Sequence, residues 1–255
     1  MIVRTLQWNI GGAKIREADS DKVSEGSYVN DGLHYVVRTI ADMGPDIVTL
    51  QEVHGNDVQN QAEYITDECG LKYVAYDSYD ASHIEKGQRL GQAVISRFPI
   101  VSHDFSLFVN PKFEIDRPDG EHWISHDKGL TSCLLKIEDR EIMVQTLHSV
   151  PFRKFGVDAL GGEASAVRKD MVHKLDQSHG SYILQADFNY NEPSIKPFLT
   201  PLFDSGLNEV ILSLPTTPKG RWYDHVLYRG VSHVKSYVMN EALTDHYPVY
   251  TEFSI

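Results

Sequence analysis

Acidic, amide and imidazole side chains adjoin apolar runs at several places along the chain. They are Asn9, Glu52, His148, Asp187, Asn189, Asp245 and His246. Carboxylate and amide oxygens are hard ligands of the kind that hold Mg²⁺, which neutralises phosphate charge. An imidazole paired with a carboxylate can move protons. If the apolar runs are strands that share one sheet edge, these side chains converge on one rim, and hydrolysis of a phosphoester needs this set of side-chain types.

Short runs of β-like composition recur along the whole length and would position these groups. They cover residues 2–8, 47–51, 72–76, 92–96, 130–137, 142–147, 182–185, 225–228, 234–239 and 249–253. Three segments have apolar residues at helical spacing instead: 33–43, 58–69 and 164–175. A few helices among many strands predict an α/β fold with mixed sheets rather than a regular βαβ array. The stretch 103–128 shows neither period, so we expect a long surface excursion there.

Composition and charge narrow the class of protein. Of 255 residues, 41% are hydrophobic, enough for a sizeable core, and the net charge of −12 argues against a broad basic face that coats nucleic acid or an anionic membrane. Only Cys69 and Cys133 occur, and we expect both to be buried free thiols. We find no repeat, linker or secretory leader. The simplest expectation is one domain over residues 1–255, monomeric and cytoplasmic, with no transmembrane segment.

Seven sequence blocks resemble the endonuclease/exonuclease/phosphatase superfamily, also called deoxyribonuclease I-like. In chain order they are Trp8-Asn9-Ile10, Leu50-Gln51-Glu52-Val53, the run from Gly91 to Ile100, Leu147-His148-Ser149, Ala186-Asp187-Phe188-Asn189, Tyr223-Asp224-His225-Val226-Leu227 and Thr244-Asp245-His246-Tyr247-Pro248. Each block alone is weak, but together they span residues 8–248 in the family's order. The chain departs from the pattern only at Ala186 and Thr244, where the family usually has Gly and Ser.

The resemblance implies a four-layer α/β sandwich with two packed mixed β-sheets flanked by helices. It implies that Glu52 is the principal Mg²⁺ ligand, with Asn9, Asp187 and Asp245 close to the metal, and that Mn²⁺ can substitute. It also implies that His246 is the general base and that Asp224 orients it. In the same way, His148 would stabilise the transition state or aid the leaving group, and Asn189 would orient the phosphate or the nucleophile. The implied chemistry is in-line attack of water at phosphorus.

Several other residues have more than one interpretation. His122 and His126 have the four-residue spacing of a zinc pair on a helix, but they lack a helical stripe and a third ligand, which disfavours zinc. The family pattern leaves His225 as a structural histidine. The basic residues Arg153, Lys154, Arg168, Lys169, Lys219 and Arg221 either form a positive rim for a phosphorylated ligand or are ordinary surface charges. The aromatic residues Trp123, Phe152, Phe155, Trp222 and Tyr223 either stack on a ligand or pack the loops.

The sequence therefore predicts a Mg²⁺-dependent phosphoester hydrolase that acts on a phosphodiester of a small, lipid or nucleotide type. The absence of a basic stripe favours such a substrate slightly over DNA or RNA, so a nuclease or end-processing enzyme of the same superfamily is the alternative. A non-catalytic binding relative is a more remote alternative, because every expected position is filled.

Overall fold

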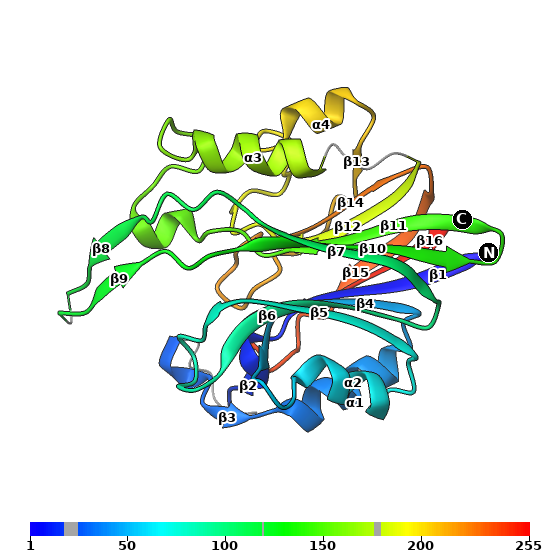
Figure 1. Cartoon of the computed structure of the whole chain (residues 1–255), viewed down its shortest axis with the longest axis horizontal. Coiled ribbons are helices and arrows are strands. Elements are labelled where there is room, and N and C mark those ends of the chain that lie inside the picture. The colour runs from blue at the N-terminus through cyan, green and yellow to red at the C-terminus, as the bar shows by residue number, and fades with distance from the viewer. Residues whose placement is uncertain (18–24, 119, 176–179) are drawn as a thin grey trace.

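Two six-stranded β-sheets pack face to face at the centre of the protein, as a computed structural model describes it for residues 1–17, 25–118, 120–175 and 180–255 (Figure 1). The first sheet has the order β15 (Ser232–Val238), β16 (Val249–Ser254), β1 (Ile2–Asn9), β4 (Ile47–Gly55), β6 (Arg89–Ser96) and β5 (Tyr73–Ala81). The second has the order β13 (Asn208–Glu209), β14 (Asp224–Arg229), β12 (Ser181–Asp187), β11 (Arg140–Leu147), β10 (Gly129–Ile137) and β7 (Ile100–Leu107). Each sheet is mixed, because β1 pairs parallel with β4 and β11 pairs parallel with β12.

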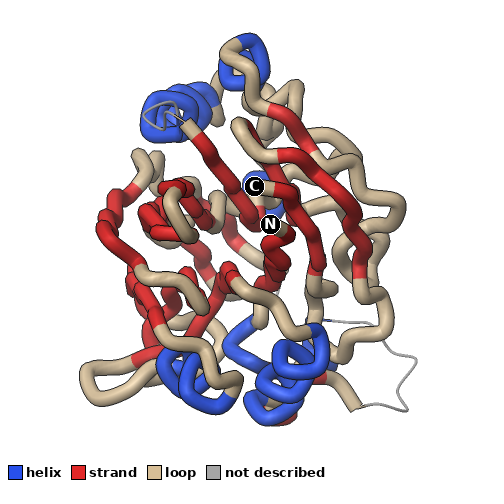
Figure 2. Tube along the Cα trace, turned by 90° about the vertical axis from the view of Figure 1, so that its right-hand side faces the viewer, coloured by secondary structure: helices blue, strands red, loops and turns tan. Residues whose placement is uncertain are grey.

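Helices cover the outer face of each sheet. In Figure 1, α1 (Leu33–Met43) and α2 (Gln61–Glu68) lie on the first sheet, while α3 (Ser165–Leu175) and α4 (Thr200–Asp204) lie on the second; Figure 2 shows the same layers from the side. Helix α1 ends at Gly44, whose φ of 57° places it in the left-handed region that glycine adopts without strain. Helix α2 begins after Asn60, whose side chain accepts a hydrogen bond from the backbone N–H of Glu63.

The remaining elements are short. Three 3₁₀ turns are η1 (Gly11–Ala13), η2 (Glu25–Ser27) and η3 (Phe152–Phe155). Two small hairpins pair β2 (Lys14–Ile15) with β3 (Asn30–Asp31) and β8 (Glu114–Asp116) with β9 (His122–Ile124). Among the described helices, none combines the length and the apolar character needed to cross a bilayer.

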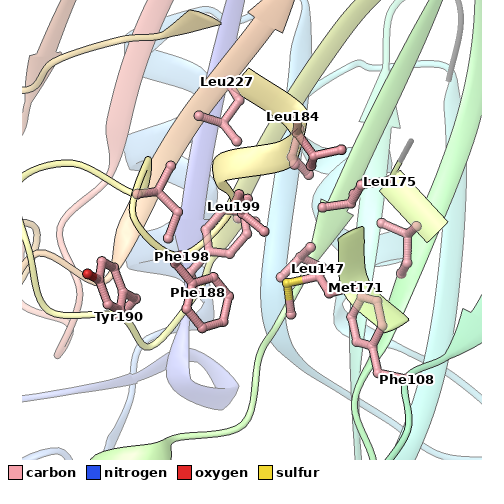
Figure 3. Packing of buried hydrophobic residues seen from close by; sticks show 14 of the residues in the cluster. Phe108, Leu147, Met171, Leu175, Leu184, Phe188, Tyr190, Phe198, Leu199 and Leu227 are labelled. Atoms are coloured by element: carbon pink, nitrogen blue, oxygen red, sulfur yellow. The ribbon is translucent and has the colours of Figure 1, made fainter. Parts of the chain in front are cut away.

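Each pair of adjacent layers encloses its own hydrophobic core. The outer face of the first sheet packs on α1 and α2 through Leu6, Leu50 and Val36. The outer face of the second sheet packs on α3 and α4, and Figure 3 shows Leu184 and Leu227 of the sheet with Met171 and Leu175 of α3 in this core. Because side chains alternate along a strand, residues next to these point into the space between the two sheets.

The space between the sheets changes character along its length. At one end it is filled by apolar side chains such as Val3, Ile47 and Ile183. Towards the C-terminal ends of β1, β4 and β12 it contains buried amides and hydroxyls. Gln185 Nε2 donates to Thr5 Oγ1 at 2.9 Å. We call this polar part, made by Thr5, Gln7, Gln51, Gln92, Thr131, Thr146 and Gln185, the polar seam.

The structure confirms the predicted fold class, with two mixed sheets between two helical layers. Two local predictions are wrong. Residues 103–107 belong to β7, an edge strand whose mostly exposed side chains hide the β period, and the rest of the stretch 103–128 contains the β8–β9 hairpin. Val58 is 90% exposed and precedes α2, so the second helix is shorter than its apolar spacing indicated. Cys133 is buried as expected, whereas Cys69 is only half-buried, and both are free thiols.

Candidate active site

The predicted site residues meet at one end of the sandwich, around a pocket of about 730 Å³. This main pocket is lined, among other residues, by Asn9, Glu52, His148, Asp187, Asn189, Asp245 and His246. The residues come from two sheets and not from one sheet edge as expected. Asn9 and Glu52 belong to the first sheet, whereas His148 and Asp187 lie at the ends of β11 and β12 in the second. The site therefore depends on how the two sheets pack.

A β-bulge turns Glu52 into the main pocket. Leu50 and Val53 both pack in the outer core beneath α1 and α2. Strict alternation would leave one inward-facing residue between two outward-facing ones, and Gln51 takes that position. The pairing of β4 with β6 shifts at this point: Gln51 pairs with Gln92, Val53 pairs with Gly91, and Glu52 is the extra residue. Its φ of 51° lies in the left-handed region, which is unusual for a glutamate. Bulges of this kind re-aim a side chain.

The surroundings of Glu52 keep its carboxylate ionised. Burial alone would raise its pKa, but the electrostatic effect of the neighbouring His148, His83, Lys128 and Lys154 side chains outweighs burial and lowers the pKa to about 2. Within the part of the chain that the structure describes, no donor hydrogen-bonds this carboxylate; His148 Nε2 lies 3.8 Å from Oε1. An ionised carboxylate that faces a pocket with no direct hydrogen bond is suited to a cation.

Asp245 and Asn9 lie beside a tight turn at the same pocket. The backbone N–H of Gly11 donates to Asn9 Oδ1 at 3.0 Å. Gly11 has a φ of 53°, and a Cβ at this position would lie 2.9 Å from Asp245 Oδ1, so any other residue would be strained there and crowd that carboxylate. With Glu52, these residues supply carboxylate and amide oxygens, a donor set that fits Mg²⁺ or Mn²⁺.

His246 and Asp224 form a hydrogen-bonded pair at the edge of the polar seam. His246 Nδ1 lies 2.8 Å from Asp224 Oδ2, and Gln7 Nε2 donates to the other oxygen, Asp224 Oδ1, at 2.7 Å. Burial alone would lower the pKa of His246, but the carboxylates of Asp224 and Asp187 raise it well above its usual value. The carboxylate of Asp224 thus fixes the ring, and Nε2 of His246 is left facing Asp187 at 3.7 Å.

Asp187 lies between the two histidines and is 1% exposed. Its Oδ2 accepts from Asn9 Nδ2 at 2.9 Å, and its Oδ1 accepts from the backbone N–H of Asn189 at 2.8 Å. Burial, together with the charge of Asp224, raises the pKa of Asp187 to about 7. Ligand atoms of Asp187, Asp224 and His246 lie within 4.8 Å of one another, close enough for one ion, but the His246–Asp224 bond already occupies one atom of each partner.

The contacts of His148 define its tautomer. Lys128 Nζ lies 3.0 Å and Tyr79 Oη 3.2 Å from His148 Nδ1. A protonated lysine can only donate, so Nδ1 accepts and Nε2 carries the hydrogen of the neutral ring. Burial, followed by the charge of Lys128, lowers the pKa of His148 well below its usual value, which keeps the ring neutral. Its Nε2–H therefore points towards Asp187 Oδ2 at 3.5 Å and the main pocket.

Sequence reasoning missed four residues that hold this site together. Lys128 and Tyr79 orient His148, and burial lowers the pKa of Lys128 to about 8. No sequence signal marks Tyr79, whereas Lys128 directly precedes an apolar run. Gln7 Nε2 also donates to Gln51 Oε1 at 2.8 Å, and Gln51 Nε2 donates to Thr146 Oγ1 at 2.7 Å. Their signal was an amide inside an otherwise apolar strand.

Two other histidine predictions can be compared with the structure. His122 lies on β9 with Nδ1 2.8 Å from Asp116 Oδ1, and His126 lies 3.2 Å from Asp80. Neither belongs to a three-ligand cluster among the described residues, which argues against the zinc interpretation. His225 Nδ1 lies 3.0 Å from Glu209 Oε1 beneath the main pocket, in agreement with a structural role.

Some of the aromatic and basic residues singled out from the sequence pack inside the protein, and others line the main pocket. Phe152 is buried in the outer core, and Trp222 packs against the core between the sheets. Trp123 and Phe155 line the main pocket. Lys154 and Lys219 line it too, whereas Arg168 is bound to the backbone oxygens of Ala159 and Gly161 and stabilises a loop.

Comparison with known proteins agrees with this geometry. A sequence profile described as the endonuclease/exonuclease/phosphatase family matches residues 6–246. An endonuclease/exonuclease/phosphatase from Beutenbergia cavernae has a similar fold, with a TM-score of 0.76 and 16% identity over 100% of this chain and 72% of that one. D. rerio TDP2 complexed with a single-strand DNA product gives 0.65 and 12%, over 100% and 99% of the two chains. The mannosyl-6-phosphatase Bt3783 of Bacteroides thetaiotaomicron gives 0.60 and 16%, over 99% and 100%.

The curated sequence relatives match only part of this chain. A UPF0294 protein of Vibrio vulnificus is 29% identical over 140 residues, which is 53% of this chain and 48% of that protein. The chain thus spans about half the length of the curated relatives it matches. The profile covers nearly the whole chain, and the chain belongs to the endonuclease/exonuclease/phosphatase family, whose members are metal-dependent phosphoesterases.

Proposed function

We propose that this protein is a Mg²⁺-dependent phosphoester hydrolase in which His246 activates water for attack at phosphorus. The observation that carries the proposal is the main pocket itself. It combines a hydrogen-bonded His246–Asp224 pair with the ionised carboxylate of Glu52, which accepts no hydrogen bond from the described residues. A proton acceptor and a cation ligand in one pocket are the two requirements of metal-assisted hydrolysis.

We propose that Glu52, Asn9 and Asp245 hold the metal, with Mn²⁺ able to replace Mg²⁺, because their carboxylate and amide oxygens face the main pocket. Asp187 is the fourth predicted ligand, and its oxygens also accept hydrogen bonds from Asn9 Nδ2 and from the backbone N–H of Asn189. When bound, the cation would stabilise negative charge on the phosphoryl oxygens and would lower the pKa of the neighbouring His246. The other groups of the site then act on substrate and water.

The chain's own residues have distinct tasks in this proposal. Nε2 of His246 takes the proton of the attacking water, while Asp224 holds the ring through Nδ1. Asp187, beside Nε2 of His246, orients the water. His148 donates its Nε2–H to a phosphoryl oxygen, which stabilises the transition state. Asn189 faces the pocket with its side-chain Nδ2 bound to Ser149 O at 3.1 Å, a position from which it can help orient the phosphate.

For the substrate, we propose a phosphodiester of a small, lipid or nucleotide type. The net charge of −12 and the confinement of Lys154 and Lys219 to the pocket rim support a compact ligand. A nuclease is the second candidate, because the same fold is found in a protein bound to a DNA product. The cytoplasmic location, the monomeric state and the single-domain organisation stay predictions from the sequence.

A substrate panel tests the proposal. Purified protein would be stripped with a chelator and assayed with added Mg²⁺ or Mn²⁺ on bis(p-nitrophenyl) phosphate, a phosphoinositide, sphingomyelin, single-stranded DNA and RNA. We expect metal-dependent hydrolysis of at least one small ester. Cleavage of only DNA or RNA, falling steeply with salt, would favour the nuclease. A complete lack of hydrolysis with either metal would reject the proposed function.

A further inference from the structure

A second pocket of about 400 Å³ adjoins the main pocket. The two share Pro151, Lys154, Asn189 and Lys219, so a ligand in one can extend into the other. The second pocket also has Arg153, Arg221 and the ring of Tyr223 in its wall. It therefore carries four positive side chains around one aromatic ring, which is unusual for a protein of net charge −12.

Among these positive side chains, the two arginines lack a carboxylate partner in the part of the chain that the structure describes. Across the described part of the chain, no carboxylate lies within 4.0 Å of the guanidinium of Arg153 or Arg221. Like charges held together repel one another, so a cluster of this kind is favourable only when an anion joins it. Arginine binds phosphate through two parallel hydrogen bonds, which lysine cannot reproduce.

The loop that carries Arg221 is held in place from within. The backbone N–H of Arg221 donates to Thr217 Oγ1 at 3.0 Å, and Arg221 O accepts from the backbone N–H of Thr216 at 2.8 Å. Thr216 Oγ1 in turn accepts from the backbone N–H of Asp224 at 3.2 Å. The loop is thus tied to the residue that orients His246, and a pre-organised loop loses little entropy when a ligand binds.

The ring of Tyr223 connects the second pocket with His246. Its centroid lies 6.0 Å from that of His246, with an angle of 31° between the planes. Tyr223, which is part of the wall of the second pocket, therefore lies beside the proposed general base. A ligand with its reacting phosphorus beside His246 can extend a further substituent into the second pocket, towards Arg153 and Arg221.

We propose that the second pocket binds a second phosphate of the substrate, so that the preferred ligands carry two phosphates about one sugar unit apart. This rests on the proposed function and names its substrate class further. A wall with Arg153 and Arg221 beside Lys154 suits a terminal phosphomonoester, with a charge near −2, better than an internucleotide diester with a charge of −1. A bisphosphorylated small molecule is therefore the better match.

Ligand binding tests this without turnover. Thymidine 3′,5′-bisphosphate and thymidine 5′-monophosphate would be titrated calorimetrically into wild-type protein, with a chelator present to prevent hydrolysis. We expect the bisphosphate to bind roughly tenfold more tightly or better, the worth of one charge-assisted contact. Equal affinity for the two ligands would overturn the proposal.

Variants assign the preference to the pocket. The double variant Arg153→Gln/Arg221→Gln should lose most of the preference for the bisphosphate. Arg140→Gln, an exposed arginine at the start of β11 and at the opposite end of that strand from His148, is the matched control and should keep it. Equal weakening of both ligands in the double variant would contradict a local subsite, because it would indicate only a general charge effect.

A third ligand distinguishes the source of the second phosphate. The dinucleotide pTpT has an internucleotide diester where the bisphosphate has a monoester. We expect it to bind more weakly than the bisphosphate, and equal or tighter binding would overturn the monoester assignment. If the substrate panel shows no hydrolysis but the bisphosphate preference persists in these titrations, the proposed reaction fails and the subsite stands; the reverse pattern removes the subsite alone.

Discussion

The two faces of the same strands differ sharply in chemistry. On β12, Leu184 and Ala186 point into the apolar outer core, whereas Gln185 and Asp187 point inward. On β1, Leu6 and Trp8 pack beneath α1 and α2, while the inward residues include Gln7. The outer faces thus attach the helices, and the inner face of the same strands delivers polar groups to the site.

Packing two sheets through the polar seam lowers the stability of the fold relative to an apolar interface. Gln7 Oε1 and Gln185 Oε1 are buried, and neither has a hydrogen-bond partner among the described protein atoms. A buried polar atom left unpaired costs about 1–3 kcal/mol. An apolar seam would avoid this cost but would leave Asp224 without the amide of Gln7. The comparison teaches that the outer cores stabilise the fold, whereas the seam positions the proposed catalytic groups.

The largest effect should come from removing the base. His246→Ala should lower kcat by roughly 10²–10⁴-fold, the usual contribution of a general base. The exposed His34 of α1 provides a control, and His34→Ala should leave kcat unchanged. Steady-state kinetics of both variants on the best panel substrate measure this. Near-normal turnover by His246→Ala would contradict the assignment.

A truncation in the outer core should affect stability rather than catalysis. Leu184→Ala leaves a cavity beneath α3, and we expect it to lower the free energy of unfolding by about 2–5 kcal/mol. The folded fraction should keep its kcat, because the inward residues of β12 are unchanged. Urea denaturation and kinetics on the same sample test both statements. A large fall in kcat with little loss of stability would show that the division between the two faces is wrong.

Two matched substitutions in the polar seam should give a smaller effect. Gln7→Leu removes the donor to Asp224 and should lower kcat by roughly tenfold, at the low end for a partner that orients a functional group. Gln185→Leu makes the same change at an amide whose one hydrogen bond among the described residues goes to Thr5, and it should leave kcat near the wild-type value. Kinetics at saturating substrate compare the two variants. Equal effects would mean that the seam acts through stability alone.

The smallest effect is expected at Val58. This residue is exposed and lies before α2, so Val58→Ser should change the free energy of unfolding by no more than about 0.5 kcal/mol. Ile65 belongs to the same predicted apolar stripe but is fully buried. Ile65→Ala should lower the free energy of unfolding by about 2–5 kcal/mol. Thermal or urea melts compare them. A similar loss of stability at both positions would support the longer helix that the apolar spacing predicted.

Much of this arrangement follows from the sequence, but the relations between distant segments do not. Alternation and helical spacing predicted the ten main strand runs and the three longer helices, because each depends on neighbours in the chain. The edge strand β7 escaped because its exposed side chains carry no apolar pattern. The polar residues near the strand ends were found, but their origin in two different sheets depends on packing that no local pattern encodes.

Glu52 and His148 show the same limit at the scale of single residues. The sequence block predicted that Glu52 is a metal ligand, but its inward direction depends on the bulge opposite Gly91, and strict alternation would have pointed Glu52 outward. The tautomer of His148 depends on Tyr79, which lies on β5, and on Lys128, which directly precedes β10. Such contacts are set by tertiary structure and leave little trace in the spacing of residues.

The most direct test of the account is the Mg²⁺ dependence of turnover in Glu52→Gln compared with wild type. Glu63→Gln, an exposed glutamate in the first turn of α2, is the control. We predict that Glu52→Gln needs a much higher Mg²⁺ concentration for half-maximal rate and is slower at saturation, whereas Glu63→Gln follows wild type. An unchanged Mg²⁺ curve for Glu52→Gln would contradict the claim that the bulge delivers the metal-binding carboxylate.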